Sequence, residues 1–323
     1  MMEIQKRTFT FDSVVTGEHI FVRVVEPACR EQAVAVLMVT HGMAEHGGVY
    51  EDYASFMAEH GYVVVVQDHL GHGRSVAEGE DFGYFGNGGC HNLVMDMKKL
   101  HTMLRDDYEP LPFLLFGHSM GSFLARAYMA RFGGDMKAAV FMGTSAGSGK
   151  IMAGLQQRAL QMLIRRKGPK GHDPLPEKLS TGAYNKSFAP NRTANDWVSS
   201  DEEEVDRYTR DPLCGFPLTL SGYRDVAKLL DQVNQSLWYQ RIPKDTPMLL
   251  ISGEQDPVGD FGKGVRKVYE RMKKVGCQVQ LKLYPSVRHA LITEKNREEV
   301  FGDLLAFLEG ALPQSEREEA VAC

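Results

Sequence analysis

The sequence predicts an α/β fold with a mainly parallel central sheet, helices on both of its faces, and an inserted cap. Short segments of strand character alternate with helix-compatible segments through most of the chain. Such alternation is typical of a parallel sheet covered by its crossover helices. The alternation of strands and helices ends after residue 143, and the next core strand begins about a hundred residues later. A parallel crossover needs only about a dozen residues, so we interpret residues 144–246 as a cap on a core of residues 1–143 and 247–323.

The core elements follow in an order that local patterns predict. Residues 7–11 and 19–25 have β character and open the chain. Strand patterns then occupy residues 33–39, 62–66, 113–116, 138–142, 247–251 and 279–284. Helix-compatible segments lie near residues 50–60, 92–104 and 122–131. The second of these carries apolar side chains on one helical face, at Leu93, Met97, Leu100 and Leu104.

The overall composition argues against two classes of partner. The chain has 323 residues, of which 43% are hydrophobic, and this is ample for a sizeable core. Its 37 basic and 42 acidic side chains give a net charge of −5. We therefore expect neither nucleic-acid binding nor electrostatic attachment to anionic lipid.

The cysteines and the amino-terminal residues indicate the cellular compartment in which the protein resides. The five cysteines are scattered and show no C-x-x-C spacing, at Cys29, Cys90, Cys214, Cys277 and Cys323. This pattern argues for reduced thiols. The first residues lack the apolar core of a signal peptide, and no run reaches the length of a membrane span. We expect a soluble, cytoplasmic protein.

A glycine-flanked serine lies between the fifth predicted strand and the helix that follows it, in residues 117–121 (GHSMG). A nucleophilic serine on such a strained turn needs glycine on both sides, because a Cβ there would collide with neighbouring backbone. The pattern G-x-S-x-G alone is a weak signal, since it also occurs by chance. Ser119 is the candidate nucleophile, with Gly117 and Gly121 as elbow glycines.

Candidates for a base and an acid follow two other predicted strands. Asp256 lies in the loop after the seventh strand, and His289 lies in the loop after the eighth. The carboxyl ends of parallel strands meet at one edge of a sheet, so both side chains should emerge beside Ser119. The chain order of Ser, Asp and His also agrees with a serine on a strand-to-helix elbow. Glu254 is a rival for the acid role.

Two backbone N–H groups should face the oxyanion of a tetrahedral intermediate, each worth roughly 3 kcal/mol. One belongs to Met120, the residue after the serine. The other should lie in the loop after an early strand, where Thr40-His41-Gly42-Met43 follows the third predicted strand. Met43 is the candidate, because Gly42 lets the backbone approach closely.

Together these motifs resemble the α/β-hydrolase family of monoacylglycerol lipases and bacterial lysophospholipases, which is grouped with the serine aminopeptidases S33. The resemblance covers most of the chain and rests on residues 41–46 (HGMAEH), 68–75 (DHLGHGRS), 117–121 (GHSMG), 211–216 (DPLCGF) and the loops of Asp256 and His289. It implies an α/β-hydrolase fold. It also implies a serine carboxylic-ester hydrolase that cleaves monoacylglycerol or lysophospholipid through an acyl-enzyme on Ser119.

Two positions depart from the family pattern. Ser122 stands where a third elbow glycine is common, and Ala290 follows the predicted base where bacterial relatives often carry an acid. Neither touches the predicted triad, but both bear on the choice of substrate.

The cap should carry the information on substrate. Five of its side chains could line an acyl pocket: Leu155, Tyr184, Phe188, Trp197 and Phe216. An apolar stripe is formed by Ile151, Leu155, Ala159, Met162 and Leu163. We interpret the stripe as the buried side of a helix packed on the cap, with transient contact to lipid aggregates as the alternative. The acidic run of residues 201–204 is typical of a solvated first helical turn.

We expect no metal and no cofactor. The chain has eleven histidines, and His69 and His72 lie beside Asp68. The H-x-H-x-D-H type of spacing that dinuclear hydrolases use is absent, however. The resemblance instead makes this segment a turn after a core strand.

Three other functions stay open. The chain could be a carboxylesterase for small esters, or a peptidase or amidase of the same fold. A peptidase would need acidic groups for the substrate's amino terminus, and residues 201–204 could supply them. A non-catalytic binding module is the least favoured, because the Ser, Asp and His set is intact.

Overall fold

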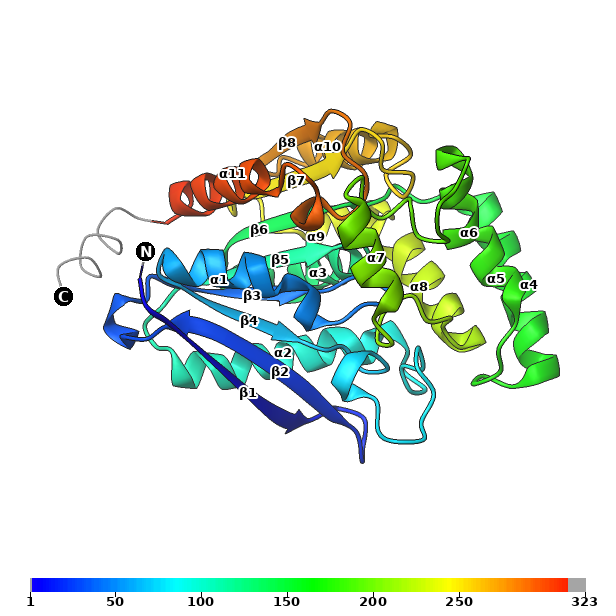
Figure 1. Cartoon of the computed structure of the whole chain (residues 1–323), viewed down its shortest axis with the longest axis horizontal. Helices are drawn as coiled ribbons and strands as arrows, with labels where there is room; N and C mark the ends of the chain where they lie inside the picture. The colour runs from blue at the N-terminus through cyan, green and yellow to red at the C-terminus, as the bar shows by residue number, and fades with distance from the viewer. Residues whose placement is uncertain (1, 313–323) are drawn as a thin grey trace.

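The computed structural model describes residues 2–312, so the predicted thiol of Cys323 lies outside the described residues. An eight-stranded sheet runs through the centre of the molecule in the order β1-β2-β4-β3-β5-β6-β7-β8 (Figure 1). Its strands are β1 (Ile4–Asp12), β2 (His19–Pro27), β3 (Ala35–Thr40), β4 (Tyr62–Gln67), β5 (Phe113–His118), β6 (Met136–Met142), β7 (Met248–Gly253) and β8 (Val279–Tyr284). Only the pairs β1·β2 and β2·β4 are antiparallel. The predicted α/β-hydrolase architecture with a mainly parallel sheet is confirmed.

The central strands are apolar because both faces of the sheet are covered. Every residue of β3, β4, β5 and β7 is buried. One apolar core lies under α2 (Cys90–Asp107), α3 (Met120–Phe132) and α10 (Lys263–Lys274). A second core lies under α1 (Glu51–Glu59) and α11 (Arg297–Gly310). Strands that are buried on both faces are expected to be largely apolar runs, and each of these strands is apolar except for the one or two residues at its carboxyl end.

The segment between β6 and β7, residues 144–246, is called the cap segment below. Its α-helices are α4 (Lys150–Lys167), α5 (Pro174–Leu179), α6 (Thr181–Tyr184), α7 (Glu202–Arg210), α8 (Leu220–Val233) and α9 (Ser236–Arg241). In Figure 1, α4, α5 and α6 lie at one end of the molecule, toward which the arrowheads of β7 and β8 point. Within residues 2–312, the short 3-10 helices are η1 (Arg30–Gln32), η2 (Gly47–Tyr50), η3 (Gly73–Ser75), η4 (Gly133–Asp135), η5 (Asn185–Phe188) and η6 (Leu291–Thr293).

The prediction that the apolar stripe of α4 packs on the cap is wrong. Ile151 is 84% exposed, Leu155 53% and Met162 60%. The buried face of α4 is instead made by Leu160 and Ile164, and α4 packs against α8. This helix carries two apolar stripes, and either could face the interior. Which one is buried depends on contact with α8, a helix that begins about 50 residues after α4 ends.

Two smaller findings bear on the compartment. Cys29, Cys90, Cys214 and Cys277 all carry free thiols. Within residues 2–312, no helix has both the length and the apolar character that crossing a bilayer requires. The cytoplasmic location stays a prediction.

Candidate active site

Ser119 lies on the turn between β5 and α3, with a φ of +53°. Its two glycine neighbours make the turn possible. A Cβ on Gly117 would lie 2.4 Å from the carbonyl oxygen of Gly121, and a Cβ on Gly121 would lie 2.1 Å from that of Thr40. Both distances are far too short for a real contact, so no other residue type fits without moving the backbone. The turn leaves Ser119 half-buried, while its neighbours His118 and Met120 are buried.

Asp256 and His289 meet at the ends of β7 and β8. His289 Nδ1 lies 2.9 Å from Asp256 Oδ1, and both side chains are buried. Burial alone would raise the pKa of the Asp256 carboxyl. The charge of His289 and the hydrogen bonds that the carboxyl accepts hold that pKa below its usual value. Those bonds come from the His289 ring, the Val258 N–H and the Ser252 hydroxyl. The pair is therefore arranged to keep Asp256 ionised and to fix the histidine ring.

The rival acid Glu254 is not part of this pair. Its side chain is exposed, and its backbone N–H donates to the carbonyl of Tyr284 in the neighbouring strand. Close packing fixes this register, because a Cβ on Gly253 would lie 2.0 Å from the carbonyl oxygen of Val287 in the His289 loop.

The ring of His289 is enclosed by three neighbours. Its centroid lies 4.7 Å from that of His118 and 5.1 Å from the nearer aromatic ring of Trp197. Gly143 passes so close that a Cβ there would lie 2.9 Å from His289 Cε1. The Nε2 atom has no hydrogen-bond partner among the described residues. Because His118 directly precedes Ser119, the serine and the Asp256–His289 pair belong to one site.

The predicted oxyanion loop follows β3 and passes beside the serine. A Cβ on Gly42 would lie 3.1 Å from the Cβ of Ser119. Met43 is the next residue of this loop, and Met120 begins α3, where the first N–H groups of a helix have no acceptor within it. This placement brings both predicted oxyanion donors near Ser119, and their role stays a prediction.

A buried carboxylate holds the oxyanion loop in place. Glu45 Oε1 accepts hydrogen bonds from the Gly42 N–H and from the Tyr50 hydroxyl at 2.7 Å, and it lies 3.1 Å from His118 Nδ1. Burial would raise the pKa of Glu45, yet attraction to His118 and their hydrogen bond hold that pKa well below its usual value. Glu45 thereby links the loop after β3 to the elbow after β5. Tyr50 was not predicted, because nothing in its local sequence marks it as a partner.

The histidines of the two glycine-rich loops form a neutral cluster. Burial lowers the pKa of His41, His69 and His72 to about 3. His41 Nε2 accepts the His69 N–H at 2.9 Å, so the His41 ring proton is on Nδ1 and faces the Gly42 carbonyl. These rings therefore act as neutral hydrogen-bonding groups behind the oxyanion loop.

One trio of potential metal ligands lies where the cap segment meets the oxyanion loop. Ligand atoms of His46, Asp211 and Cys214 all lie within 4.8 Å of one another. His46 Nδ1, however, accepts the Gly48 N–H, which places the ring proton on Nε2, 2.9 Å from Asp211 Oδ2. A ligating histidine needs that nitrogen unprotonated and normally donates from the other one. The trio fits a hydrogen bond between two loops rather than a metal site.

The predicted substrate-binding residues fall into separate places. Trp197 packs on His289, and Tyr184 packs on Trp197 with ring centroids 5.3 Å apart. Phe188 lies in the same small apolar cluster. Phe216 packs instead against His72 and Phe82. Leu155 is exposed on α4, so the structure brings only three of the five side chains together beside the predicted base.

Arg126 of α3 is a buried residue that sequence reasoning missed. It is 1% exposed and has no carboxylate partner among the described residues. Its guanidinium donates instead to the Val233 carbonyl at the end of α8, to Asn234 and to the Tyr239 hydroxyl. Arg126 thus ties the elbow helix to the cap segment. No local sequence signal marks it, because these three partners lie 107, 108 and 113 residues away and its other acceptors, Thr144 and Ser145, follow β6.

Comparisons with known proteins identify the family of the chain. Residues 31–296 match the family model described as serine aminopeptidase, S33. The chain is 27% identical to a monoacylglycerol lipase of Mycolicibacterium smegmatis over 84% of this chain and 87% of that protein. It is 28% identical to a human monoglyceride lipase over 86% of this chain and 82% of that protein.

Among solved structures, a thermostable carboxyl esterase from Bacillus coagulans in complex with glycerol superposes with a TM-score of 0.87. It is 28% identical and covers 96% of this chain and 99% of its own. The family match spans more than half of the chain and contains both the serine elbow and the loops of the Asp256–His289 pair. The protein therefore belongs to the serine aminopeptidase S33 family of α/β-hydrolases.

Proposed function

We propose that the protein is a serine carboxylic-ester hydrolase that cleaves monoacyl lipids, monoacylglycerol or lysophospholipid, with Ser119 as nucleophile, Asp256 as acid and His289 as base. The observation that carries the proposal is the convergence of the strained Ser119 elbow with the buried Asp256–His289 pair at the carboxyl ends of the sheet. These are the groups that acyl transfer to serine requires.

The reaction follows from these groups. His289 Nε2 takes the hydroxyl proton while Ser119 Oγ bonds to the ester carbonyl carbon, and the Met43 and Met120 N–H groups stabilise the oxyanion. Collapse breaks the bond to the alcohol, which leaves with the proton from His289. Water then attacks the acyl-enzyme by the same route, releasing the fatty acid and restoring Ser119. Asp256 keeps the ring proton on Nδ1 throughout.

The choice of monoacyl lipid is supported by relatives whose names specify it. The mycobacterial and human proteins, both named as lipases of this substrate, each align over more than four fifths of the chain. A second candidate is hydrolysis of small esters, because the solved structure compared above, with a TM-score of 0.87, is a carboxyl esterase.

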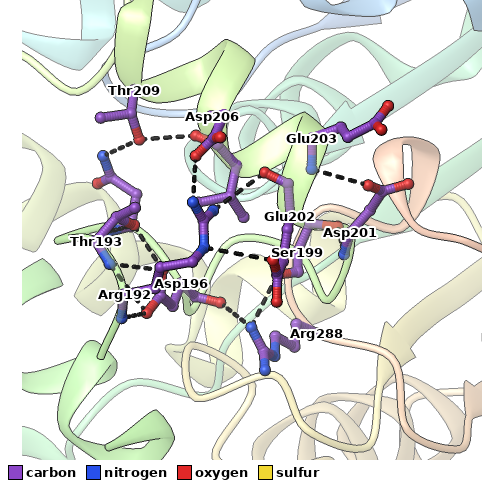
Figure 2. Close-up of polar contacts among 12 residues, drawn as sticks. Arg192, Thr193, Asp196, Ser199, Asp201, Glu202, Glu203, Asp206, Thr209 and Arg288 are labelled. Atoms are coloured by element: carbon purple, nitrogen blue, oxygen red, sulfur yellow. Dashed lines mark hydrogen bonds and ion pairs between the residues drawn. The ribbon is translucent and has the colours of Figure 1, made fainter. Parts of the chain in front are cut away.

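The peptidase alternative loses its main support. Asp201 is the N-cap of α7 and accepts the Glu203 N–H, as Figure 2 shows. Glu204 is buried and pairs with Arg207 and Arg297. The acidic run therefore forms the N-cap and first turn of α7, as predicted, with Glu202 and Glu203 exposed to solvent. Asp201 caps the helix and Glu204 is held in ion pairs, so the run is not gathered to bind an amino terminus.

A tunnel for one acyl chain above Ser119 stays a proposal. The two surface cavities that stand out, near Met2 and Glu3 and near Tyr84 and Gly86, lie away from the serine. The support for a tunnel is the aromatic wall of Tyr184, Phe188 and Trp197 next to His289.

The acyl-chain profile should distinguish the two candidate functions. Each buried methylene contributes about 0.8 kcal/mol at most, so kcat/KM should rise severalfold per CH₂ until the tunnel is filled and then fall. Diacyl and triacyl lipids should be poor substrates. The measurement is kcat/KM over p-nitrophenyl esters of graded length, monoacylglycerols, lysophospholipids and aminoacyl amides.

Each outcome of that profile has a distinct meaning. A rise with chain length supports a monoacyl lipid substrate. A flat or falling profile from acetate upward would instead assign the protein to the small-ester hydrolases. Faster turnover of aminoacyl amides than of any ester would assign it to the peptidases.

We also propose that the outer face of α4 contacts lipid aggregates transiently. Ile151 and Met162 are exposed there, and Arg158, Arg165 and Arg166 are exposed on the same helix. An exposed apolar stripe bordered by basic residues is typical of a helix that rests on a lipid surface. In Figure 1, α4 lies at the end of the molecule, and its residues Ile151 and Met162 are exposed there.

The double variant Ile151→Gln/Met162→Gln should lose severalfold activity on monoacylglycerol in vesicles, because it removes the apolar side chains that enter the interface. Its rate on dissolved p-nitrophenyl acetate should not change. Leu237→Gln, which changes another exposed apolar residue, 53% exposed on α9, is the control. Equal vesicle rates for wild type, the double variant and the control would refute the contact.

A further inference from the structure

We propose that Trp197 is a positioning residue for the general base, and that residues 196–200 of the cap segment clamp the loop that carries His289. This inference rests on the proposed serine-hydrolase function and extends it, because it makes part of the cap a support of the catalytic histidine. Four independent sets of contacts carry it.

The first set is the contact between the rings. Trp197 is only 8% exposed, and its indole packs on the His289 imidazole at 5.1 Å with 35° between the planes. Tyr184 supports the indole from the cap side at 5.3 Å. A packed indole cannot move without displacing Tyr184, so it forms a rigid wall for the imidazole.

The second set joins the two backbones beside the rings. The Ala290 N–H donates to the Val198 carbonyl at 2.8 Å, so the residue after Trp197 is bonded to the residue after His289. On the other side of the histidine, the Arg288 guanidinium donates to the carbonyls of Asp196 and Ser199 (Figure 2). The clamp thus holds both chain neighbours of His289.

The third set involves Glu294, which is 1% exposed. Its carboxylate accepts the Arg288 N–H at 2.7 Å from the histidine loop. It also accepts the N–H and the hydroxyl of Ser200 from the cap segment. The Ser199 hydroxyl adds a bond to the Thr293 carbonyl at 2.9 Å. One buried carboxylate therefore joins the clamp to both ends of the histidine loop.

The fourth set makes the cap side rigid. Asp196 accepts hydrogen bonds from the Thr193 N–H and hydroxyl, and Arg192 pairs with Asp206 on α7 (Figure 2). Asn195 donates to the Thr209 hydroxyl on the same helix. These bonds fix residues 192–196 to α7, so the clamp is a firm anchor rather than a loose loop.

The physical need for such a clamp follows from the geometry of the base. The hydrogen bond to Asp256 restrains Nδ1, but one hydrogen bond at one edge of the ring restrains the tilt of the imidazole plane less. A wall against the ring restricts that tilt and aims Nε2. An error of about 1 Å in the position of a reacting group can cost about a hundredfold in rate. An indole also attracts the imidazolium that forms as the proton is transferred.

The test compares Trp197→Leu and Trp197→Phe, with p-nitrophenyl acetate as substrate because its acyl group does not need the tunnel. We expect Trp197→Leu to lower kcat by about ten- to a hundredfold with KM changed less than about threefold. Trp197→Phe keeps an aromatic wall and should stay within about threefold of wild type in kcat. Trp238→Leu, the same change at the other tryptophan of the chain, is the control and should leave kcat unchanged.

A second readout reports on the ring directly. The Nδ1–H proton shared by His289 and Asp256 should give a low-field proton resonance, sharp in wild type and in Trp197→Phe and broadened or lost in Trp197→Leu. Arg288→Met, which cuts the two carbonyl contacts but keeps the indole, should also broaden it and supplies the test if Trp197→Leu does not fold.

Two results would overturn the clamp. One is a Trp197→Leu variant with wild-type kcat and a sharp resonance. The other is a Trp197→Phe variant as impaired as Trp197→Leu, because an aromatic wall would then be insufficient. Failure of the proposed function is distinguishable, since a wild-type protein that hydrolyses no ester would refute that function while the resonance still tests the clamp.

Discussion

Replacing Ser119 by alanine is expected to lower kcat for ester hydrolysis by about 10⁴- to 10⁶-fold, because the variant has no nucleophile and cannot form an acyl-enzyme. Folding should be preserved. Alanine also has a Cβ, so it meets the φ of +53° at the same backbone cost as serine. The measurements are steady-state kinetics and urea unfolding, with labelling by a fluorophosphonate to locate the reactive serine.

Ser286→Ala is the matched control for this change. Ser286 also has a left-handed φ of +60°, lies on an exposed turn and precedes His289 by three residues. The control should keep wild-type kcat and wild-type labelling. Fluorophosphonate labelling that persists in Ser119→Ala would show that another residue is the nucleophile and would falsify the assignment.

The sequence predicted the framework well because its strongest signals are local. Strands β3, β4, β5 and β7 are buried on both faces, so each begins with four or five consecutive apolar residues. The parallel order then places the loops after β5, β7 and β8 at one edge, which is why the elbow motif, the chain order and the loop positions could together predict Ser119, Asp256 and His289 as one site. The two elbow glycines could also be named, because close backbone contacts exclude every side chain there.

The parts that were missed depend on partners far away in the chain. Tyr50 meets His118, which lies 68 residues later in the chain, only after β3 and β5 have become neighbours. The buried face of α4 depends on α8, so its own pattern of apolar residues could not decide between two stripes.

The role of Trp197 was missed for a similar reason. An aromatic residue in the cap can belong to the core or line a pocket. The sequence does not show that Trp197 contacts His289, nor that Arg288 bonds to residues on either side of Trp197 in the chain. The cap and the histidine loop are about 90 residues apart in the chain, so only their pairing in the fold defines the clamp.

Replacing Asp256 by asparagine is expected to lower kcat by about 10⁴-fold, by analogy with the same change in a serine protease triad. Asparagine can still fill the site, but its amide would favour the proton on Nε2 of His289, and this nitrogen could then no longer take the Ser119 proton. Steady-state kinetics measure the loss. Glu254→Gln is the control from the same loop and should stay within a few-fold of wild type, because Glu254 is exposed and does not bond to His289.

The same variant should also change the pH dependence of stability, and the direction follows from the pKa shift. The pKa of Asp256 is lower in the folded protein than in the unfolded chain, so its ionised form stabilises the fold above the unfolded value. This stabilisation is lost as the pH falls through the folded pKa. Asp256→Asn should therefore be less stable than wild type at pH 7, with a difference that shrinks in acid, as urea unfolding across pH would measure.

A greater loss of kcat in Glu254→Gln than in Asp256→Asn would contradict the pairing of Asp256 with His289, because the exposed carboxylate would then be the one that orients the base.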